Sequence, residues 1–327
     1  MRKLFIDKLP ILIVGIVSVF LIVAVFLYIE KWDESQGSFP EHEVTDPTIE
    51  HNGTSYIPKD TIETFLVLGL DKHDGEGQAD SYNNNKQADF LMLFVLDHAT
   101  KQYAAIHINR DTIVDVNVLG VAGNRVDTLR KQIALAHTYG NGRDVSCRNA
   151  ADSVSSLLMG VKVNHYISMT LDTVTVMNDL VGGVEVVVLD DFTGIDDTLI
   201  KGETVTLTGD QPLTYIRTRY GMEDDTNAAR MKRQEQYLEA LLEAFKDSVA
   251  HDAEFIVDAS LKVSDHIISD RSVTQLQTLG EKFDQYEFLG IQSIEGTSVM
   301  GAEFMEFHAD ESAVKELVIN FFYKPKA

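Results

Sequence analysis

The sequence predicts an α/β fold in three layers, α/β/α, with a mixed central sheet and one transmembrane helix before it. Short apolar runs typical of buried strands alternate along the chain with longer segments that repeat apolar residues at helical spacing. The stretch 11–29 holds 19 residues without a charge. As a helix it would extend about 29 Å, close to the hydrocarbon thickness of a bilayer.

The charges around the stretch 11–29 predict how the chain is oriented. Arg2, Lys3 and Lys8 precede it and mostly acidic residues follow it, so the positive-inside rule places the N-terminus in the cytoplasm and the rest outside. The segment 28–32 lacks the small residues of a signal-peptide cleavage site, which favours an uncleaved anchor over a cleaved signal peptide. We therefore expect a single-pass protein of the cell membrane with an extracellular C-terminal domain.

The composition excludes several classes of protein. Acidic residues outnumber basic ones by 51 to 28, and the formal net charge is −23. This charge argues against a nucleic-acid binder and against polybasic contact with an anionic membrane surface. Cys147 is the only cysteine, so no intramolecular disulfide can form. An extracellular domain without disulfides fits a Gram-positive-type bacterium.

Composition also divides the chain into five segments. Residues 1–10 form a short cytoplasmic segment and 11–29 the anchor. Residues 30–60 are polar, with prolines at 40, 47 and 58, and are typical of an extracellular stalk. The main folded domain is expected at 61–251, and 252–327 are expected to extend that same domain.

Five apolar runs predict strands. They lie at 64–70, 90–96, 103–108, 184–189 and 205–207. Apolar residues at helical spacing, often stopped by glycine, predict the helices. These lie at 127–139, 149–158, 172–181, 227–251, 272–283 and 311–321.

Four arginines fall within seventeen positions of this acidic chain. The segment 214–219 is predicted as a strand, which would place Arg217 and Arg219 on one face. On the helix predicted at 227–251, Arg230, Arg233 and Gln234 share one stripe. Guanidinium groups are always charged and match phosphate oxygens with paired donors, so the cluster indicates a phosphate-rich ligand. The alternative is that the arginines pair with nearby carboxylates, which are Glu223, Asp224 and Asp225.

Charged residues also stand at the ends of three predicted strands. Asp71 follows the first strand, Asp89 opens the second, and Arg110 and Asp111 follow the third. Loops at strand ends converge on the crevice beyond a sheet. Two carboxylates there suit Mg²⁺, which prefers carboxylate, water and phosphate oxygens. The alternative is that Asp71 and Asp89 only cap turns.

Other chemistries lack their motifs. The sequence has no P-loop, no G-x-S-x-G elbow and no H-E-x-x-H zinc pair. His137 and His165 lie among core-like residues and are expected to pack or hydrogen-bond rather than to bind a metal. Cys147 has no adjacent base, so we expect an inert thiol.

A series of motifs occurs in order between residues 65 and about 245. They are Leu68-Gly-Leu-Asp71, Gln87-Ala-Asp89, Ile108-Asn-Arg-Asp-Thr112, Leu135-Ala-His-Thr-Tyr-Gly140, His165-Tyr166, Leu180-Val-Gly-Gly-Val184, Leu207-Thr-Gly-Asp-Gln-Pro-Leu-Thr-Tyr-Ile-Arg217-Thr-Arg219, and the run from Asp225 through Arg230 to Gln234. Behind a single N-terminal anchor, this series resembles the LytR-CpsA-Psr family of cell-envelope phosphotransferases.

The resemblance implies an extracellular α/β/α domain that transfers a glycopolymer from a polyprenyl-pyrophosphate carrier to peptidoglycan. Asp71 and Asp89 would hold Mg²⁺ against the pyrophosphate, and an apolar tunnel would hold the lipid. The oxygens of the pyrophosphate would be bound by Arg110, Arg217, Arg219, Arg230, Arg233 and Gln234. Of these, Arg110 and Arg217 would be catalytic together with Asp89. Asp89 or Asp225 would assist deprotonation of the acceptor hydroxyl.

One position departs from the family pattern. The family commonly has arginine two residues before the second aspartate, where this chain has Gln87 beside Lys86. Gln87 can hydrogen-bond the substrate but brings no charge. Two alternatives therefore stand beside the transferase. One is a polyprenyl-pyrophosphate-glycan hydrolase, and the other is a non-catalytic anchored module that binds lipid-linked wall precursors.

Overall fold

The computed structural model describes residues 48–70, 87–252, 255, 259, 262–263, 266–271 and 286–326. The predicted anchor at 11–29, the predicted metal ligand Asp71 and the predicted helix at 272–283 lie outside these residues. No helix within the described ranges is long and apolar enough to cross a membrane.

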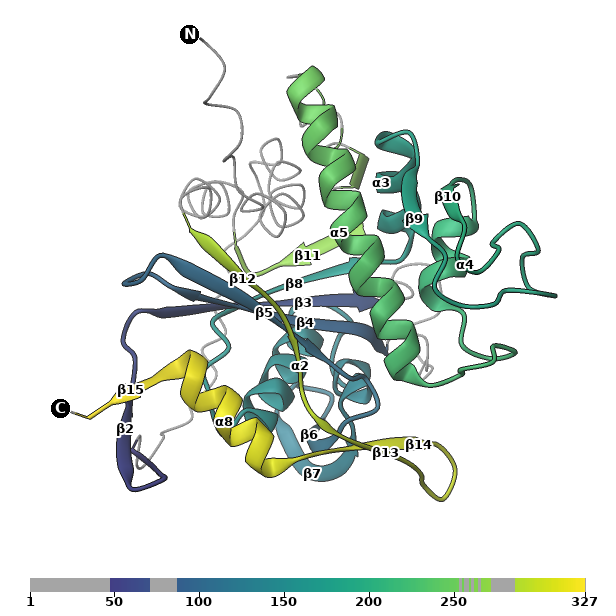
Figure 1. Ribbon diagram of the computed structural model, residues 1–327. Helices are drawn as coiled ribbons and strands as arrows, with labels where there is room; N and C mark the ends of the chain where they lie inside the picture. The colour runs from purple at the N-terminus through teal and green to yellow at the C-terminus, as the bar shows by residue number, and fades with distance from the viewer. Residues whose placement is uncertain are drawn as a thin grey trace, which may run out of the picture.

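A mixed six-stranded sheet forms the centre of the domain (Figure 1). β3 pairs in parallel with β8 and β5 with β12, while β3–β4, β4–β5 and β8–β11 are antiparallel. In spatial order the strands are β11 (Ile267–Ser269), β8 (His165–Thr170), β3 (Ile62–Leu70), β4 (Ala88–Asp97), β5 (Gln102–Ile108) and β12 (Glu287–Ser293). The predicted mixed sheet is confirmed, and its three leading strands lie where the apolar runs predict them.

Helices cover both faces of this sheet, as Figure 1 shows. Alternate residues of a strand point to opposite faces. Phe65 and Val67 of β3 pack with α3 (Asp172–Leu180), α4 (Gln211–Arg217) and α5 (Asn227–His251). Leu66 and Leu68 pack on the other face with α2 (Asp144–Leu157) and α8 (Glu311–Phe322). The predicted α/β/α layering is therefore confirmed.

Shorter elements surround the three layers. Two antiparallel hairpins, formed by β6 with β7 and by β13 with β14, lie on the side of the sheet that α2 and α8 cover. A third two-stranded unit pairs β9 with β10, and a small sheet joins β1, β2 and β15. Their bounds are β1 (Ile49–His51), β2 (Thr54–Pro58), β6 (Ile113–Leu119), β7 (Arg125–Gln132), β9 (Val184–Val187), β10 (Thr204–Leu207), β13 (Gly296–Met300), β14 (Met305–Ala309) and β15 (Tyr323–Pro325).

Four of the predicted helices are confirmed. α5 begins and ends where the apolar pattern predicts, and Thr226 caps its first turn by accepting a hydrogen bond from Ala229 N at 3.2 Å. α3 and α8 match their predicted ranges to within a residue. α2 begins at Asp144, five residues before the predicted start.

The helix predicted at 127–139 is wrong. The chain instead forms β7 and a short 3-10 helix, η4 (Ile133–Thr138). Leu129, expected to face the core, is 40% exposed, because β7 pairs with β6 in register from Ile113–Gln132 to Leu119–Arg125. Tertiary pairing with a neighbouring strand has outweighed the weak local helical pattern.

The strand predicted at 214–219 is also wrong, because residues 211–217 form α4. Pro212 stands in the first turn of this helix, where a missing backbone N–H costs nothing. Tyr215 and Ile216 bury against the core from one side of the helix. Arg217 therefore ends the helix, and Arg219 follows the extended residue Thr218 that caps it.

Arg233 of α5 holds the end of α4 in place. Its side chain is 1% exposed, and its Nε donates to Tyr215 O at 2.8 Å. Its two other nitrogens bond Thr218 O and the carboxylate of Asp190. The next residue, Gln234, donates to Ile216 O at 3.3 Å. A helix leaves its last carbonyls unpaired, and here two side chains of α5 satisfy them.

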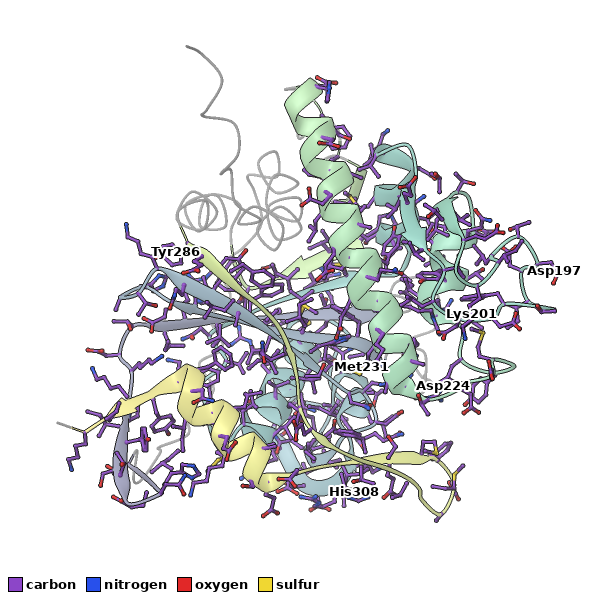
Figure 2. All side chains as sticks on the ribbon, viewed as in Figure 1. Asp197, Lys201, Asp224, Met231, Tyr286 and His308 are labelled. Atoms are coloured by element: carbon purple, nitrogen blue, oxygen red, sulfur yellow. The ribbon has the colours of Figure 1, made fainter. Side chains whose placement is uncertain are left out.

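A network of titratable side chains lies at the end of the sheet where β3 and β8 begin. Glu63 accepts hydrogen bonds from His98 at 2.8 Å and lies 3.4 Å from His165, which in turn lies 3.3 Å from Asp270. His98 also contacts the hydroxyl of Tyr286, at the end of the sheet away from Asp224 (Figure 2). The contact with His165 holds the pKa of Glu63 down at about 2. Burial alone would lower the pKa of His165, but Asp270 and Glu63 raise it above its ordinary value.

This network makes stability depend on pH in a defined direction. The Glu63 contribution is present above pH 4.5 and is lost as pH falls toward 2, because its pKa is depressed in the folded state. The His165 contribution is full below pH 6.5 and is lost as pH rises through its raised pKa. We expect Glu63→Gln to lower stability by on the order of 1 kcal/mol between these limits. Thermal unfolding measured across pH should show the stability difference between wild type and Glu63→Gln shrinking at both low and high pH. The control Glu185→Gln, at an exposed position, should unfold like wild type at every pH. A stability difference for Glu63→Gln that stays constant with pH would contradict the assignment.

Removing Arg233 should destabilise the fold. Arg233→Met leaves three acceptors without their donor, among them the Asp190 carboxylate, and breaking such a pair costs about 3 kcal/mol or more. Urea unfolding measures this change, with Arg125→Met on exposed β7 as the matched control. Equal stability of the two variants would show that α4 does not depend on Arg233.

Candidate active site

A cavity of about 1540 Å³ opens between the sheet and the helices α3, α4 and α5. One part of its wall is apolar and another part is charged, and both belong to one continuous space. The charged part lies where β4 begins and β5 ends, beside the first turns of α5. The strand-end location matches the crevice that the sequence predicts.

The apolar part of the cavity runs along α5. Arg230 marks its charged end, and Tyr237, Leu238 and Leu241 line the wall further along the same helix. At 1.5 Å per residue, the path from Arg230 to Leu241 is about 16 Å long. The opposite wall is formed by the sheet and α3, through Val67, Phe90, Met92, Phe94, Met169, Leu171, Val174 and Met177. The cavity therefore has an apolar path that ends at a cluster of cations.

Arg110 stands at the centre of the charged part. Its Nη1 pairs with Asp89 Oδ1, and its Nη2 donates to Gln87 Oε1. Arg110 follows β5, while Asp89 and Gln87 lie at the start of β4, so the antiparallel pairing of the two strands brings them together. Gln87 thus positions Arg110 instead of adding a positive charge of its own.

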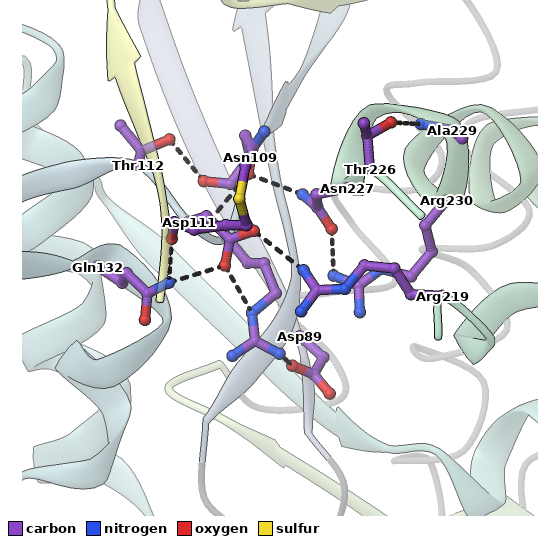
Figure 3. A network of polar contacts seen from close by, with 12 residues as sticks. Asp89, Asn109, Asp111, Thr112, Gln132, Arg219, Thr226, Asn227, Ala229 and Arg230 are labelled. Carbon is purple, nitrogen blue, oxygen red and sulfur yellow. Dashed lines mark hydrogen bonds and ion pairs between the residues drawn. The ribbon is translucent and has the colours of Figure 1, made fainter. Parts of the chain in front are cut away.

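Asp111 joins two of the arginines. Its Oδ1 lies 3.6 Å from Arg110 Nε, and its Oδ2 accepts a hydrogen bond from Arg219 Nη1 at 3.2 Å (Figure 3). Gln132 Nε2 also donates to Asp111 Oδ1, at 3.0 Å. The carboxylate is buried, so its charge acts on the arginines with little screening by solvent.

Arg219 is further fixed by Tyr220. Arg219 Nη2 donates to the Tyr220 hydroxyl at 3.1 Å, and its guanidinium carbon lies 5.1 Å from the centre of that ring. Burial alone would lower the pKa of Arg219, but the contact with Tyr220 and the charge of Asp111 together raise it. Arg219 therefore remains a cation throughout the physiological range.

Arg230 is the most buried arginine that lines the cavity. Its Nη2 donates to Asn227 Oδ1, and Asn227 in turn donates to Asn109 Oδ1 at 2.7 Å (Figure 3). Burial lowers the pKa of Arg230 to about 10; Asp89 opposes this shift, and the charges of Arg110 and Arg219 add to it. The Arg230 guanidinium is still charged at neutral pH. An anion beside it would offset the repulsion among Arg110, Arg219 and Arg230.

Two buried guanidinium nitrogens have no hydrogen-bond partner within the described part of the chain. They are Nε of Arg110 and Nε of Arg230. A buried donor without an acceptor costs about 1–3 kcal/mol. Phosphate oxygens are acceptors of suitable charge for such donors.

The remaining predicted site residues divide between the cavity and the scaffold. Arg217, Gln234 and Asp225 line the cavity together with the residues above. Arg233 does not line it, because its side chain turns to the end of α4 and to Asp190. The expected stripe of Arg230, Arg233 and Gln234 therefore separates into two residues at the cavity and one that supports it.

Sequence reasoning assigned no role to several residues that organise the site. Asn109, Asp111 and Asn227 connect the arginines, and Gln132 ties Asp111 to β7. Asn109 and Asp111 flank Arg110 immediately after a buried strand, which is the one signal that pointed to them. Gln132 and Asn227 come close only through tertiary structure. Asn227 lies inside the motif run from Asp225 to Gln234, whereas nothing local in the sequence marks Gln132.

Cys147 and His137 lie in the core as predicted, but the expectation that no base lies beside Cys147 is wrong, because the His137 ring contacts its sulfur. Cys147 is buried, and this burial raises the pKa of its thiol to about 12. His137 is buried beside it, with Nε2 3.5 Å from the sulfur. A thiol that is protonated at neutral pH is a poor nucleophile, so the pair is part of the core.

The residues present fit magnesium in one specific way. Asp89 lies in the cavity, and a carboxylate that pairs with one arginine keeps further lone pairs for a cation. Among the described residues, no group of three or more His, Cys, Asp or Glu side chains is arranged to hold a metal. Mg²⁺ commonly binds through one or two carboxylates plus substrate phosphates. The donor set therefore suits a magnesium ion shared with a bound pyrophosphate rather than a closed protein cage.

Comparison with known proteins gives the family of this chain. The model of the LytR_cpsA_psr family matches residues 27–319. One relative is TagU of Enterococcus faecalis, named a polyisoprenyl-teichoic acid–peptidoglycan teichoic acid transferase; it is 27% identical over 256 residues, which are 76% of this chain and 74% of that protein. The cell wall biosynthesis protein LcpA of Corynebacterium glutamicum is 24% identical over 66% of this chain and 45% of its own length.

Solved structures share the fold. TagV of B. subtilis has a TM-score of 0.58 at 22% identity and covers 80% of this chain and 96% of its own. A protein from Streptococcus agalactiae has a TM-score of 0.61 at 17% identity, with coverage of 80% and 86%. TagT bound to LI-WTA has a TM-score of 0.57 at 18% identity, with coverage of 80% and 90%. Together with the family match across 27–319, these findings show that the chain belongs to the LytR_cpsA_psr family.

Proposed function

We propose that the protein transfers a glycopolymer from a polyprenyl-pyrophosphate carrier to peptidoglycan by forming a phosphodiester bond. The observation that carries this proposal is the single cavity in which an apolar path along α5 meets a cluster of four arginines. The relatives named teichoic acid transferases support the same reaction. A carrier with a long apolar tail and a doubly charged head matches both parts of the cavity.

The proposal gives each part of the carrier a place in the cavity. The polyprenyl chain lies along Tyr237, Leu238 and Leu241, and the pyrophosphate lies among the guanidinium groups. Four cations in one half-buried site bind an anion far better than they bind a neutral ligand. Their places are Arg110, Arg217, Arg219 and Arg230.

The reaction is a phosphoryl transfer. An acceptor hydroxyl attacks the sugar-linked phosphorus, the bond from that phosphorus to the bridging oxygen breaks, and lipid monophosphate leaves. The acceptor proton passes to a carboxylate at the charged end of the cavity, Asp89 or Asp225. Negative charge grows on the phosphoryl oxygens, and arginines already fixed by Asp111 and Asn227 stabilise it without reorganisation.

Asp89, with Asp71, would hold Mg²⁺ against the pyrophosphate. When bound there, the ion would neutralise charge on the phosphate oxygens. Arg110 already pairs with Asp89, so the carboxylate is held in position at the phosphate end of the cavity.

The membrane anchor completes the proposal. The uncharged stretch 11–29 and its basic flank support a single-pass protein whose domain works at the outer face of the cell membrane. A carrier lipid resident in that membrane would enter the cavity from its apolar end. This arrangement keeps donor lipid and wall acceptor on the same side of the bilayer.

Replacing Arg217 with alanine should abolish transfer and leave the fold intact. Loss of one donor to a developing oxyanion typically costs about 10²–10³ in rate. The assay combines the protein with a polyprenyl-pyrophosphate-linked saccharide, Mg²⁺ and peptidoglycan fragments, and identifies products by mass spectrometry. The control is Arg125→Ala on exposed β7.

The products separate the alternatives. Saccharide on the acceptor, made by wild type and Arg125→Ala alone, supports the transferase. Free sugar phosphate would identify a hydrolase, and unchanged substrate that still binds would identify a non-catalytic module. Normal transfer by Arg217→Ala would overturn the role given to the arginine cluster.

Removal of metal should stop the reaction. We expect a chelator to abolish transfer and added Mg²⁺ to restore it. Asp89→Asn keeps an oxygen for Arg110 but loses the charge, so we expect half-maximal rate at about tenfold more Mg²⁺ or higher. Titration of Mg²⁺ against initial rate measures this shift, with exposed Asp127→Asn as control. A rate that chelation leaves unchanged would contradict the metal assignment.

A further inference from the structure

The β13–β14 hairpin forms a wall at the charged end of the cavity that the proposed chemistry does not use. Six of its residues line the space: Ser298, Met300, Glu303, Phe304, Met305 and Glu306. Lys131 of β7, Thr138 of η4 and Tyr139, which follows η4, line the same cavity. In Figure 2, His308 marks the side of β14 and Asp224 marks the loop before α5. The two hairpins thus frame the charged end with residues unlike those of the apolar path.

Two large apolar side chains of this hairpin are exposed. Met300 is 71% exposed and Phe304 is 66% exposed, and both line the cavity. Exposed apolar side chains that gather beside a cavity commonly mark a binding surface. Val299 immediately precedes Met300 on β13 and, unlike Met300, does not line the cavity.

The hairpin is fixed to the arginine cluster through Asp111. Phe307 N of β14 donates to Asp111 O at 2.9 Å. Gln132 Nε2 bridges the two regions, donating to Asp111 Oδ1 at 3.0 Å and to Met305 O at 2.7 Å. A group held by the hairpin is therefore held in a defined position relative to a pyrophosphate held by Arg110 and Arg219.

The direction of the substrate follows from the two ends of the cavity. This inference rests on the proposed function, in which the lipid runs along α5 away from Arg230. The other substituent of the pyrophosphate, a sugar, must then leave the arginines on the side away from the apolar path. That side carries the two hairpins.

We propose that the β13–β14 hairpin, together with β7 and η4, is a saccharide-binding subsite. Phe304 and Met300 pack against the apolar C–H face of a pyranose ring. Glu303, Glu306 and Lys131 bond its hydroxyl groups, since these side chains accept or donate hydrogen bonds at the ring edge. The two glutamates oppose contact with an anionic membrane surface, which favours a sugar over a lipid headgroup as the ligand of the exposed pair.

A pyranose ring occurs in both substrates of the proposed reaction, as the first sugar of the donor and as a sugar of the acceptor glycan. Full-chain Phe304→Ala and Met300→Ala test the subsite, and Val299→Ala on the same hairpin is the matched control. Initial rates are measured while donor and acceptor concentrations are varied separately. Binding of polyprenyl pyrophosphate without sugar, of a soluble peptidoglycan disaccharide, and of anionic lipid vesicles is measured alongside.

We expect Phe304→Ala to raise KM for one saccharide about tenfold, or roughly 1.4 kcal/mol, with kcat nearly unchanged. Sugar-free polyprenyl pyrophosphate should bind as it does to wild type, and Val299→Ala should match wild type throughout. A shift in donor KM assigns the ring to the carrier, and a shift in acceptor KM assigns it to peptidoglycan. Either shift supports the subsite.

Other outcomes would overturn it. Wild-type kinetic constants in both Phe304→Ala and Met300→Ala would remove the subsite and leave the transferase standing. Loss of vesicle binding with unchanged saccharide constants would reassign the exposed pair to the membrane. If wild type itself fails to transfer, the proposed function fails, and the subsite is judged by disaccharide binding: weaker binding to Phe304→Ala than to Val299→Ala supports it, and equal binding overturns it.

Discussion

The site depends on holding three like charges close together in a partly buried space. Arg110, Arg219 and Arg230 lie near enough that the first two lower the pKa of the third. Such a cluster is stable only when acidic and polar groups fix each cation separately. Asp89 and Asp111 provide the charge, and each arginine keeps donor capacity toward the cavity. The arginines are therefore preorganised to bind an anion.

The scaffold around the cavity follows from this need. Arg219 can meet Asp111 only if the chain leaves α4 at a fixed angle, and Arg233 fixes that angle from inside α5. Because α5 also carries Arg230 and lines the apolar part of the cavity, this one helix fixes the positions of both the arginines and the apolar wall. A long helix packed on a sheet is stiff, so the distance between the apolar part of the cavity and the arginine cluster is built into the fold.

Much of this architecture could be predicted from local sequence, and the part that could not has a physical reason. The buried strands and α5 are long and strongly periodic, so their burial fixes their structure. β7 and α4 were predicted wrongly because a partner strand and a proline-initiated turn outweighed short local patterns. Arg217, Arg219 and Arg230 still converge on one cavity, since what mattered for the prediction was residue type rather than backbone shape. Arg233 shows what residue type alone does not predict. It is an arginine like Arg230, and only its burial against α4 shows that it supports the cavity wall and does not line the cavity.

Gln87 shows how one substitution redistributes the electrostatics of the site. Its oxygen accepts a hydrogen bond from Arg110, which an arginine at that position could not do. An arginine there would add a positive charge beside Arg110, whereas glutamine orients the same guanidinium at no cost in repulsion. The charged end of the cavity consequently carries one cation fewer than the family resemblance implies. On the proposed function, a pyrophosphate bound here would be neutralised by fewer guanidinium groups, and a larger share of its charge would fall to the divalent cation proposed at Asp89.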